Sequence, residues 1–279
     1  MGFKTLRVLY KLKVMKLSYY LLLPIILYGC SKSNDISDIN GSIQEFVIES
    51  TILKDSYPIY VYLPYNYSNN TNNQLIIGLD GETRFNEIAT LISEKIQHGK
   101  IASSVFIAIG NNQKRNRDYT PTAYAHGSGG ANNFYQFIKN ELIPELQSRY
   151  DIDPSNNKTL IGHSFGGLFT QYVMAQERTS NPFDKFIASG TSYWYDAGVI
   201  FEYEQAYANV NTDLDVSLYN GMGTLEGGVM LASFEEMNKR LASRGFPNFR
   251  HKSELITGSG HSGSAIEIFK KGLDYVFSN

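Results

Sequence analysis

Short apolar runs alternate with longer segments of helical periodicity along most of the chain. Two runs rich in β-branched and aromatic residues, 43–50 and 57–64, are separated by a polar turn and predict a leading antiparallel hairpin. Further apolar runs predict buried strands at 75–80, 104–110, 158–164, 183–190, 215–221 and 251–258. Apolar residues at spacings of three and four predict helices at 86–98, 132–150, 165–177, 228–243 and 264–277. Pro144 lies inside the second of these helices and should kink it.

This alternation predicts an α/β fold with a mostly parallel central sheet and helices on both of its faces. A chain of 279 residues can bury a large core, and we expect one domain over residues 43–279. Folds of this kind place their chemistry at the carboxyl ends of the strands. Candidate functional residues are therefore sought in the segments that follow the predicted strands.

The first residues have the pattern of an export signal rather than of folded structure. Basic residues precede the apolar run "LSYYLLLPIILY", which is shorter than the roughly 20 residues that a bilayer span needs. The only cysteine of the chain, Cys30, follows in "LYGC", which resembles the bacterial lipoprotein signal; a free or buried thiol is the alternative. We expect a signal peptide over 1–30, starting at Met1 or Met15, and a flexible polar tether over 31–42. The protein would then be lipid-anchored in the bacterial cell envelope, on the periplasmic face or the cell surface.

Charge and residue spacing narrow the classes of partner. The formal net charge is −2, and the body of the chain has no basic cluster of the kind that binds phosphate backbones, so a nucleic-acid partner is not expected. No His, Cys, Asp or Glu cluster has metal-ligand spacing, and neither a metal nor another cofactor is predicted. The expected membrane contact is the lipid anchor alone. The oligomeric state stays open.

One serine lies where a strand is predicted to turn into a helix. In "TLIGHSFGGLF", Ser164 is flanked at two residues on either side by Gly162 and Gly166, the arrangement of a nucleophile elbow. The glycines remove the collisions that side chains would make at such a sharp turn. The following helix points its amides toward the reacting centre. Ser164 is thus the predicted nucleophile; an ordinary tight turn is the alternative.

A serine hydroxyl needs a base to take its proton, and a carboxylate to orient that base. Of the five histidines, His261 follows the last predicted strand in the glycine- and serine-rich loop "ITGSGHSGSA", which favours it as the base. Glu226 follows a strand in a similar loop and is the preferred acid, with Asp196 as the alternative. The resulting chain order of serine, acid and histidine is that of α/β-hydrolases.

With these residues placed, the chain resembles the putative-esterase family of α/β-hydrolases, most closely its siderophore-esterase and esterase-D-like branches. The resemblance covers residues 45–278 and rests on "YVYLPYNY", "LIIGLDGE", "RNRDYTP", "TLIGHSFGGLF", "SGTSYWYD", "GTLEGG" and "GSGHSG". It implies the same catalytic serine, histidine and glutamate. It also implies an oxyanion hole formed by the backbone N–H of Phe165 and that of Gly81 or Glu82.

The resemblance further implies where a substrate would bind. Arg117, in "RNRDYTP", matches the arginine that helps bind the anionic catecholate in siderophore-cleaving relatives, whereas Arg115 is expected to be solvated. Trp194, in "SYWYD", is expected either to line the substrate groove or to cap the core. We therefore expect a serine esterase acting on a siderophore-type lactone or on an acylated or feruloylated glycan. The alternatives are an acyltransferase of the same fold and a non-catalytic ligand-binding lipoprotein.

Overall fold

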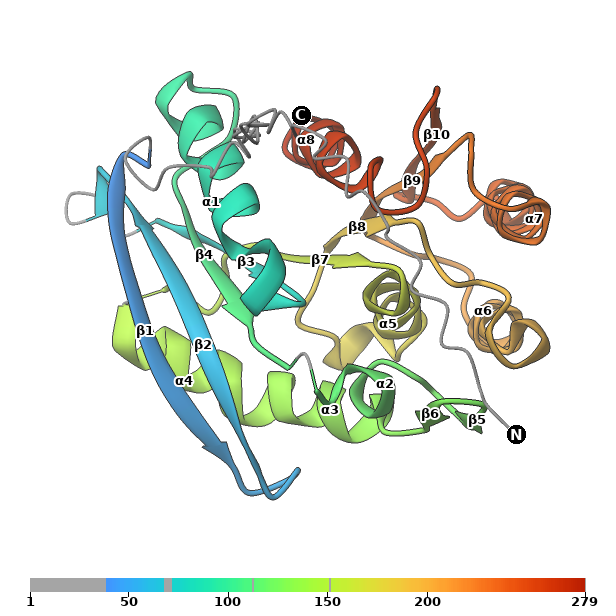
Figure 1. Ribbon diagram of the computed structural model, residues 1–279, viewed down its shortest axis with the longest axis horizontal. Helices are drawn as coiled ribbons and strands as arrows, with labels where there is room; N and C mark the ends of the chain where they lie inside the picture. Colours follow the sequence, from blue (N-terminus) through green and yellow to red (C-terminus); the bar gives the residue numbers. More distant parts are fainter. Residues whose placement is uncertain (1–38, 68–71, 112, 151, 279) are drawn as a thin grey trace, which may run out of the picture. The chain divides into compact units, whose positions relative to one another are not determined.

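A computed structural model describes residues 39–278 except 68–71, 112 and 151. The expected signal peptide, Cys30 and most of the expected tether lie outside the described residues. The described part contains an eight-stranded sheet of order β1-β2-β4-β3-β7-β8-β9-β10 (Figure 1). Its strands are β1 (Gly41–Ser50), β2 (Asp55–Pro64), β3 (Gln74–Gly78), β4 (Ser104–Ile109), β7 (Lys158–His163), β8 (Lys185–Ser189), β9 (Ser217–Gly223) and β10 (Arg250–Ile256).

The leading hairpin is antiparallel, as predicted, and the rest of the sheet is parallel. Strand β1 pairs with β2 from Gly41 opposite Pro64 to Ser50 opposite Asp55, and β2 pairs antiparallel with β4. From β4 to β10 each neighbouring pair is parallel. Every residue of β4 and β7 is buried, which explains why their sequences are nearly continuous apolar runs. The predicted α/β-hydrolase architecture is confirmed.

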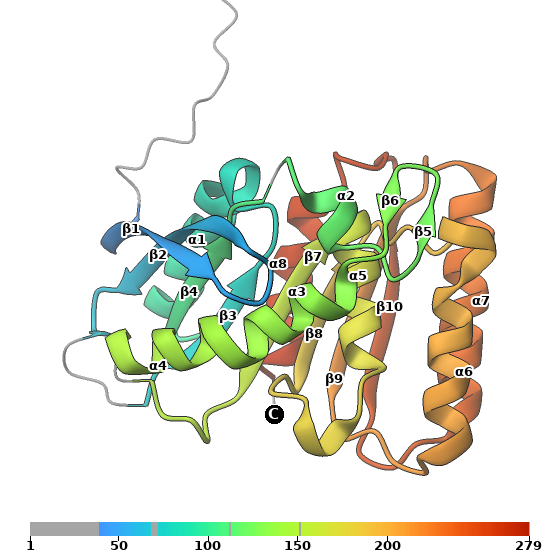
Figure 2. The same cartoon turned by 90° about the horizontal axis from the view of Figure 1, so that it is seen from below.

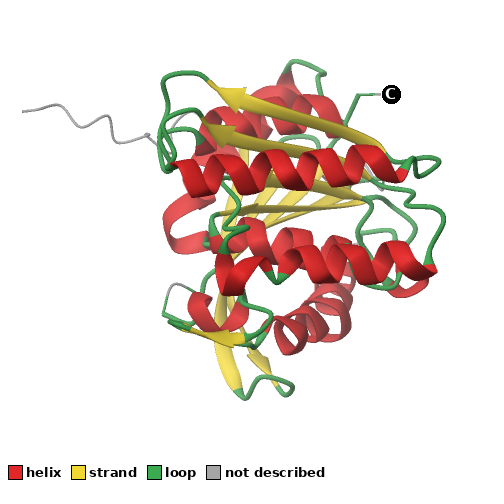
Figure 3. Cartoon of the chain, turned by 90° about the vertical axis from the view of Figure 1, so that its right-hand side faces the viewer, coloured by secondary structure: helices red, strands yellow, loops and turns green. Residues whose placement is uncertain are grey.

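Helices cover both faces of the sheet (Figures 1 and 3). One face is covered by α1 (Gly81–Gln97) and α8 (Ala265–Val276), which pack against the sheet in one apolar cluster. The other face carries α3 (Ala131–Phe137), α4 (Ile143–Tyr150), α5 (Phe165–Met174), α6 (Ile200–Val210) and α7 (Gly228–Arg244). In the part of the chain that the structure describes, no helix is long and apolar enough to cross a bilayer.

The predicted helix over 132–150 is interrupted just before its proline. A π-helical turn, Ile138–Leu142, separates α3 from α4, and Pro144 is the second residue of α4. Because proline has no N–H and its ring crowds the preceding turn, a wider turn at this point accommodates it. Helix α3, the π-helical turn and α4 together form one continuous rod along the sheet (Figure 2).

Two features were not predicted from the sequence. Helix α6 was missed because one of its inward positions is Glu204, which is buried and pairs with Arg244 at the end of α7, 2.6 Å away. The short helix α2 (Arg115–Asp118) and the two-residue strands β5 (Ala123–Tyr124) and β6 (Gly127–Ser128) lie in the loop after β4. Such short elements leave no periodicity in a sequence.

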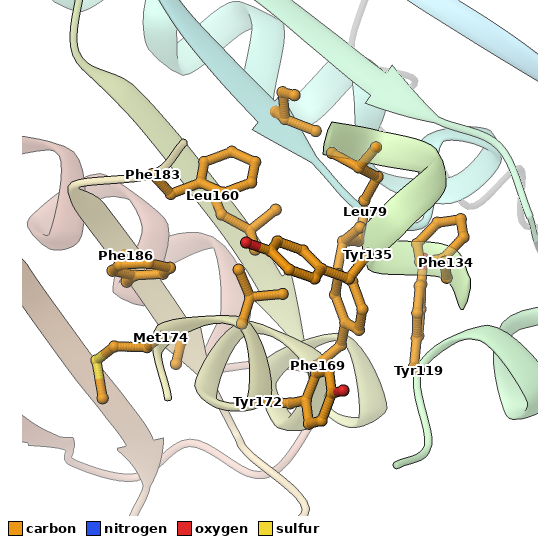
Figure 4. Close-up of a cluster of buried hydrophobic side chains, with 14 of the residues drawn as sticks. Leu79, Tyr119, Phe134, Tyr135, Leu160, Phe169, Tyr172, Met174, Phe183 and Phe186 are labelled. Atoms are coloured by element: carbon orange, nitrogen blue, oxygen red, sulfur yellow. The ribbon is translucent and has the colours of Figure 1, made fainter. Parts of the chain in front are cut away.

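Helix α5 rests on a layer of buried aromatic rings (Figure 4). The ring of Phe169 lies 5.2 Å from that of Phe134, 5.8 Å from that of Tyr119 and 6.3 Å from that of Tyr172, centroid to centroid. Aromatic pairs at these separations add about 0.5–1.5 kcal/mol each beyond the burial of their area. The layer fixes the helix that begins directly after Ser164.

Candidate active site

The elbow predicted around Ser164 has the required backbone geometry. Strand β7 ends at His163 and α5 begins at Phe165, and Ser164 between them has φ 61° and ψ −118°. A Cβ at Gly162 would lie 2.2 Å from the carbonyl oxygen of Gly166, so the turn needs glycine there. The serine itself is half-buried. This is a strained conformation of the kind that clusters at functional sites.

The predicted base and acid are hydrogen-bonded to each other. Nδ1 of His261 lies 2.8 Å from Oε2 of Glu226, and the other carboxylate oxygen accepts from the backbone N–H of Gly223 at 3.0 Å. The Glu226 side chain is 1% exposed, whereas that of His261 is 41% exposed. A buried carboxylate on Nδ1 fixes the tautomer that leaves Nε2 as the proton acceptor. Asp196, the alternative acid, instead accepts from the hydroxyl of Thr122 at 2.6 Å.

The imidazole of His261 lies at the elbow. Its ring is 4.6 Å from the ring of His163, the residue that precedes the nucleophile. Gly190 lies between them: a Cβ there would be 3.0 Å from Cε1 of His163 and 3.1 Å from Nδ1 of His261. Within the described residues the hydroxyl of Ser164 has one side-chain partner, the hydroxyl of Ser192 at 3.5 Å, and not yet the imidazole. Catalytic hydrogen bonds are often long before substrate binds.

His163, the other histidine at the elbow, stays uncharged near neutral pH. Burial, followed by the proximity of His261, lowers the pKa of His163 to about 3. Its Nδ1 lies 3.2 Å from the hydroxyl of Ser189. The site therefore contains one imidazole that stays neutral and one that is exposed and oriented by a carboxylate.

Two backbone turns meet at the position expected for the oxyanion hole. Phe165 is the first residue of α5, and its backbone N–H donates to no acceptor within the described residues. Gly81 and Glu82 are the first residues of α1, and Asp80, which precedes them, lies against the start of α5, since a Cβ on Gly166 would be 3.4 Å from Oδ2 of Asp80. Asp80 has a left-handed conformation, φ 56°, at the start of α1. The two predicted sources of N–H donors are thus adjacent.

The sequence matches the family described as Putative esterase over residues 50–251. The chain belongs to that family. Of its relatives, the siderophore triacetylfusarinine C esterase of Aspergillus fumigatus is 34% identical over 41% of this chain and 40% of the relative. The ferri-bacillibactin esterase BesA of Bacillus subtilis is 27% identical over 53% of this chain and 56% of the relative. The chain thus spans about half the length of these curated relatives.

The fold of this esterase family is seen in solved structures. The BES protein from Bacillus cereus superposes with a TM-score of 0.76 at 21% identity, and the match covers 96% of this chain and 100% of that one. At this level of identity the likeness is one of fold. It agrees with the sheet and helix arrangement described above.

The two arginines of "RNRDYTP" have different partners in the structure. Arg117 is bound by acceptors on β2 and α2: it donates to Asp55 at 2.7 Å, to Asp118 at 2.7 Å and to the hydroxyl of Tyr57 at 2.8 Å. Arg115 was expected to be solvated, which is wrong. It donates to Asp80 at 3.0 Å, and its guanidinium lies 5.8 Å from the centre of the Phe165 ring. The cation beside the elbow is therefore Arg115.

Trp194 contributes to an aromatic surface beside the nucleophile. Its ring lies 6.2 Å from that of Phe165 and 6.5 Å from that of Tyr195, and Tyr124 meets Tyr195 edge to face at 5.7 Å. Trp194 and Tyr124 are 42% and 48% exposed. Because Trp194 is exposed rather than enclosed, it does not cap the core, and its role in lining a substrate groove stays a prediction.

Three residues of the site were missed in the sequence. Asp80 holds Arg115, Ser192 donates its backbone N–H to the carbonyl of Ser164 at 3.3 Å, and Gly190 makes room for two imidazoles. Asp80 and Gly190 each left a signal, because each is the last residue of a predicted strand. Over the described ranges, no group of three or more His, Cys, Asp or Glu side chains could hold a metal ion.

The Glu226–His261 pair predicts which carboxylate activates Ser164. A fluorophosphonate probe should label Ser164 about 10²- to 10⁴-fold more slowly in Glu226→Gln, because the amide no longer orients the imidazole or stabilises its positive charge. Asp196→Asn is the matched control and should label at the parent rate. Equal labelling of Glu226→Gln and the parent protein would contradict the assignment.

Proposed function

We propose that this protein is a serine carboxylic-ester hydrolase that cleaves an extracytoplasmic ester of the siderophore type through an acyl-enzyme. The single observation that carries the proposal is that an imidazole bound to a buried carboxylate packs against His163, the residue directly before the serine of a strained elbow. Membership of the Putative esterase family supports the same reaction class. In the proposed reaction water accepts the acyl group, which distinguishes a hydrolase from an acyltransferase.

The proposed reaction follows from the geometry. Ser164 attacks the ester carbonyl as Nε2 of His261 takes its proton, and Glu226 stabilises the imidazolium that forms. The N–H of Phe165, with one from the turn at Gly81 and Glu82, stabilises the tetrahedral oxyanion; one such donor is worth about 10²–10³ in rate. His261 then returns the proton to the leaving alcohol, and water repeats the sequence on the acyl-enzyme.

The surroundings of the nucleophile support an ester with an anionic or aromatic part. Arg115 places a positive charge next to Phe165, and the exposed ring of Trp194 continues the surface. Cations and aromatic faces suit anionic rings such as catecholates. The two relatives named above, from Aspergillus fumigatus and Bacillus subtilis, are siderophore esterases. Feruloylated or acetylated glycans are the competing substrates.

We also propose that the protein acts outside the cytoplasm, held by a lipid on Cys30. The support is the sequence pattern of the first thirty residues alone. A siderophore-type ester would then meet the enzyme in the cell envelope.

Turnover of a set of esters tests the reaction and the substrate together. We expect hydrolysis of a catecholate trilactone with a higher kcat/KM than methyl ferulate, acetylated xylan or p-nitrophenyl acetate. Ser164→Ala should lose about 10³- to 10⁶-fold in kcat while remaining folded. Faster cleavage of the xylan or the ferulate would replace the siderophore assignment, and product appearing only with an added alcohol acceptor would identify a transferase. No turnover and no probe labelling by the folded protein would favour ligand binding.

Arg115 should contribute to the choice of substrate, whereas Arg117 should contribute to stability. Arg115→Gln should raise KM about tenfold for an anionic ester, the loss of one charged hydrogen bond, with little change for p-nitrophenyl acetate. Arg115→Lys keeps the charge and should retain most of the preference. Arg117→Gln, the matched control, should lower the melting temperature without a selective change in KM. The reverse pattern would restore the role that the resemblance implied for Arg117.

The lipid anchor is tested by expressing the full chain in a bacterium with labelled fatty acid. The parent protein should incorporate the label and fractionate with membranes, whereas Cys30→Ser should do neither. Membrane fractionation of Cys30→Ser at the parent level would rule out anchoring through this cysteine.

A further inference from the structure

A hollow lies at the opposite edge of the sheet from the elbow. It encloses about 460 Å³ at the amino ends of the parallel strands. Gln74 begins β3, Lys185 begins β8, Ser217 begins β9 and Arg250 begins β10, and all four line it together with Phe277, which follows α8. Ser164 lies at the carboxyl end of β7, so this hollow is separate from the candidate active site.

Three cations line this hollow, and none forms an ion pair within the described residues. Lys185 donates to the side-chain oxygen of Gln74 at 3.0 Å, and Arg178 donates to the backbone carbonyl of Phe183. Arg250 donates to the hydroxyl of Ser278 at 3.0 Å and to the carbonyl of Tyr275 at 3.3 Å. Neutral oxygens hold all three side chains in place without neutralising their charge.

Lys185 and Arg250, the first residues of β8 and β10, are close enough for their charges to interact. Burial lowers the pKa of Lys185, the charge of Asp184 opposes this, and the positive charge of Arg250 lowers the pKa further. The lysine ammonium also lies 4.3 Å from the centre of the Phe277 ring, which fixes its position. An anion between Lys185 and Arg250 would relieve their mutual repulsion.

Two carboxylates also line the hollow but leave its charge positive. Asp215 is exposed, and burial raises the pKa of Asp184, which disfavours its charged form. With both aspartates counted as charged, three cations against two anions still leave one positive charge. Arg178, Lys185 and Arg250 therefore favour an anionic ligand over a cationic one.

We propose that this hollow binds a phosphate monoester, with its phosphoryl group between Lys185 and Arg250. A guanidinium and an ammonium are the side-chain groups that proteins use to bind a phosphoryl group, and lysine contributes a point charge. A volume of about 460 Å³ is more than inorganic phosphate needs. The rest of the hollow would hold a small polyol, consistent with the hydroxyl of Ser217 and the amide of Gln74 in its wall.

Calorimetric titration of the full protein with glycerol 3-phosphate tests the proposal. We expect saturable binding to one site, no binding of glycerol, and weaker binding of inorganic phosphate. Lys185→Met and Arg250→Met should each weaken binding about 10- to 100-fold, because each removes charged hydrogen bonds. Lys270→Gln removes one positive charge from an exposed position of α8 and should bind like the parent protein.

A measurement without substitutions keeps the test decisive if a variant fails to fold. Glycerol 3-phosphate should protect Lys185, but not Lys270, from acetylation in the parent protein, read by mass spectrometry. Ester hydrolysis should not change on ligand addition, because the hollow and Ser164 lie at opposite edges. Absence of saturable binding, equal binding by Lys185→Met, or equal acetylation with and without ligand would each overturn the proposal.

Discussion

The backbone of Ser164 is the constraint on which the site depends. A non-glycine residue at φ 61° and ψ −118° costs free energy, of order 1–3 kcal/mol, and persists only where its surroundings leave no alternative. Gly162 allows the two sides of the turn to approach closely, because a Cβ there would lie 2.2 Å from the carbonyl oxygen of Gly166. The aromatic layer around Phe169 holds α5 and thereby holds the turn. The hydroxyl is thus presented by a rigid scaffold.

The remaining site residues reach the elbow through strand order. Because β8 and β9 are the next strands along the sheet from β7, the loops after them bring Gly190 and Glu226 to the same edge. The loop after β10 then places His261 on the carboxylate of Glu226. Each of these strands also contributes its other end to the amino edge, where Lys185, Ser217 and Arg250 lie. One parallel sheet therefore supports two chemically different edges.

The sequence was sufficient to predict a site residue where the local pattern and the position along the chain agree. The elbow at Ser164, the loop of His261 and the loop of Glu226 each follow a predicted strand, and parallel strands end at one edge, so their meeting could be predicted. Which of Arg115 and Arg117 lies beside the elbow could not be predicted. The two are two residues apart, and only the positions of Asp80 and Asp55 in the fold decide which arginine faces the elbow.

Helix α6 shows a second limit of sequence patterns. Its inward position at Glu204 is polar, and the arginine that compensates it is 40 residues away on α7. Hydrophobic periodicity cannot register a buried charge whose partner is distant. The π-helical turn before Pro144 is a similar case, because the proline predicts a disturbance but not the form that the backbone adopts.

The second imidazole of the site has a consequence for where a proton can go. The rings of His163 and His261 lie side by side. Burial lowers the pKa of His163 to about 3, so His163 stays uncharged throughout the neutral range. In the proposed reaction, His163 therefore does not compete for the proton that His261 takes up. The departing alkoxide is the group to which His261 returns it.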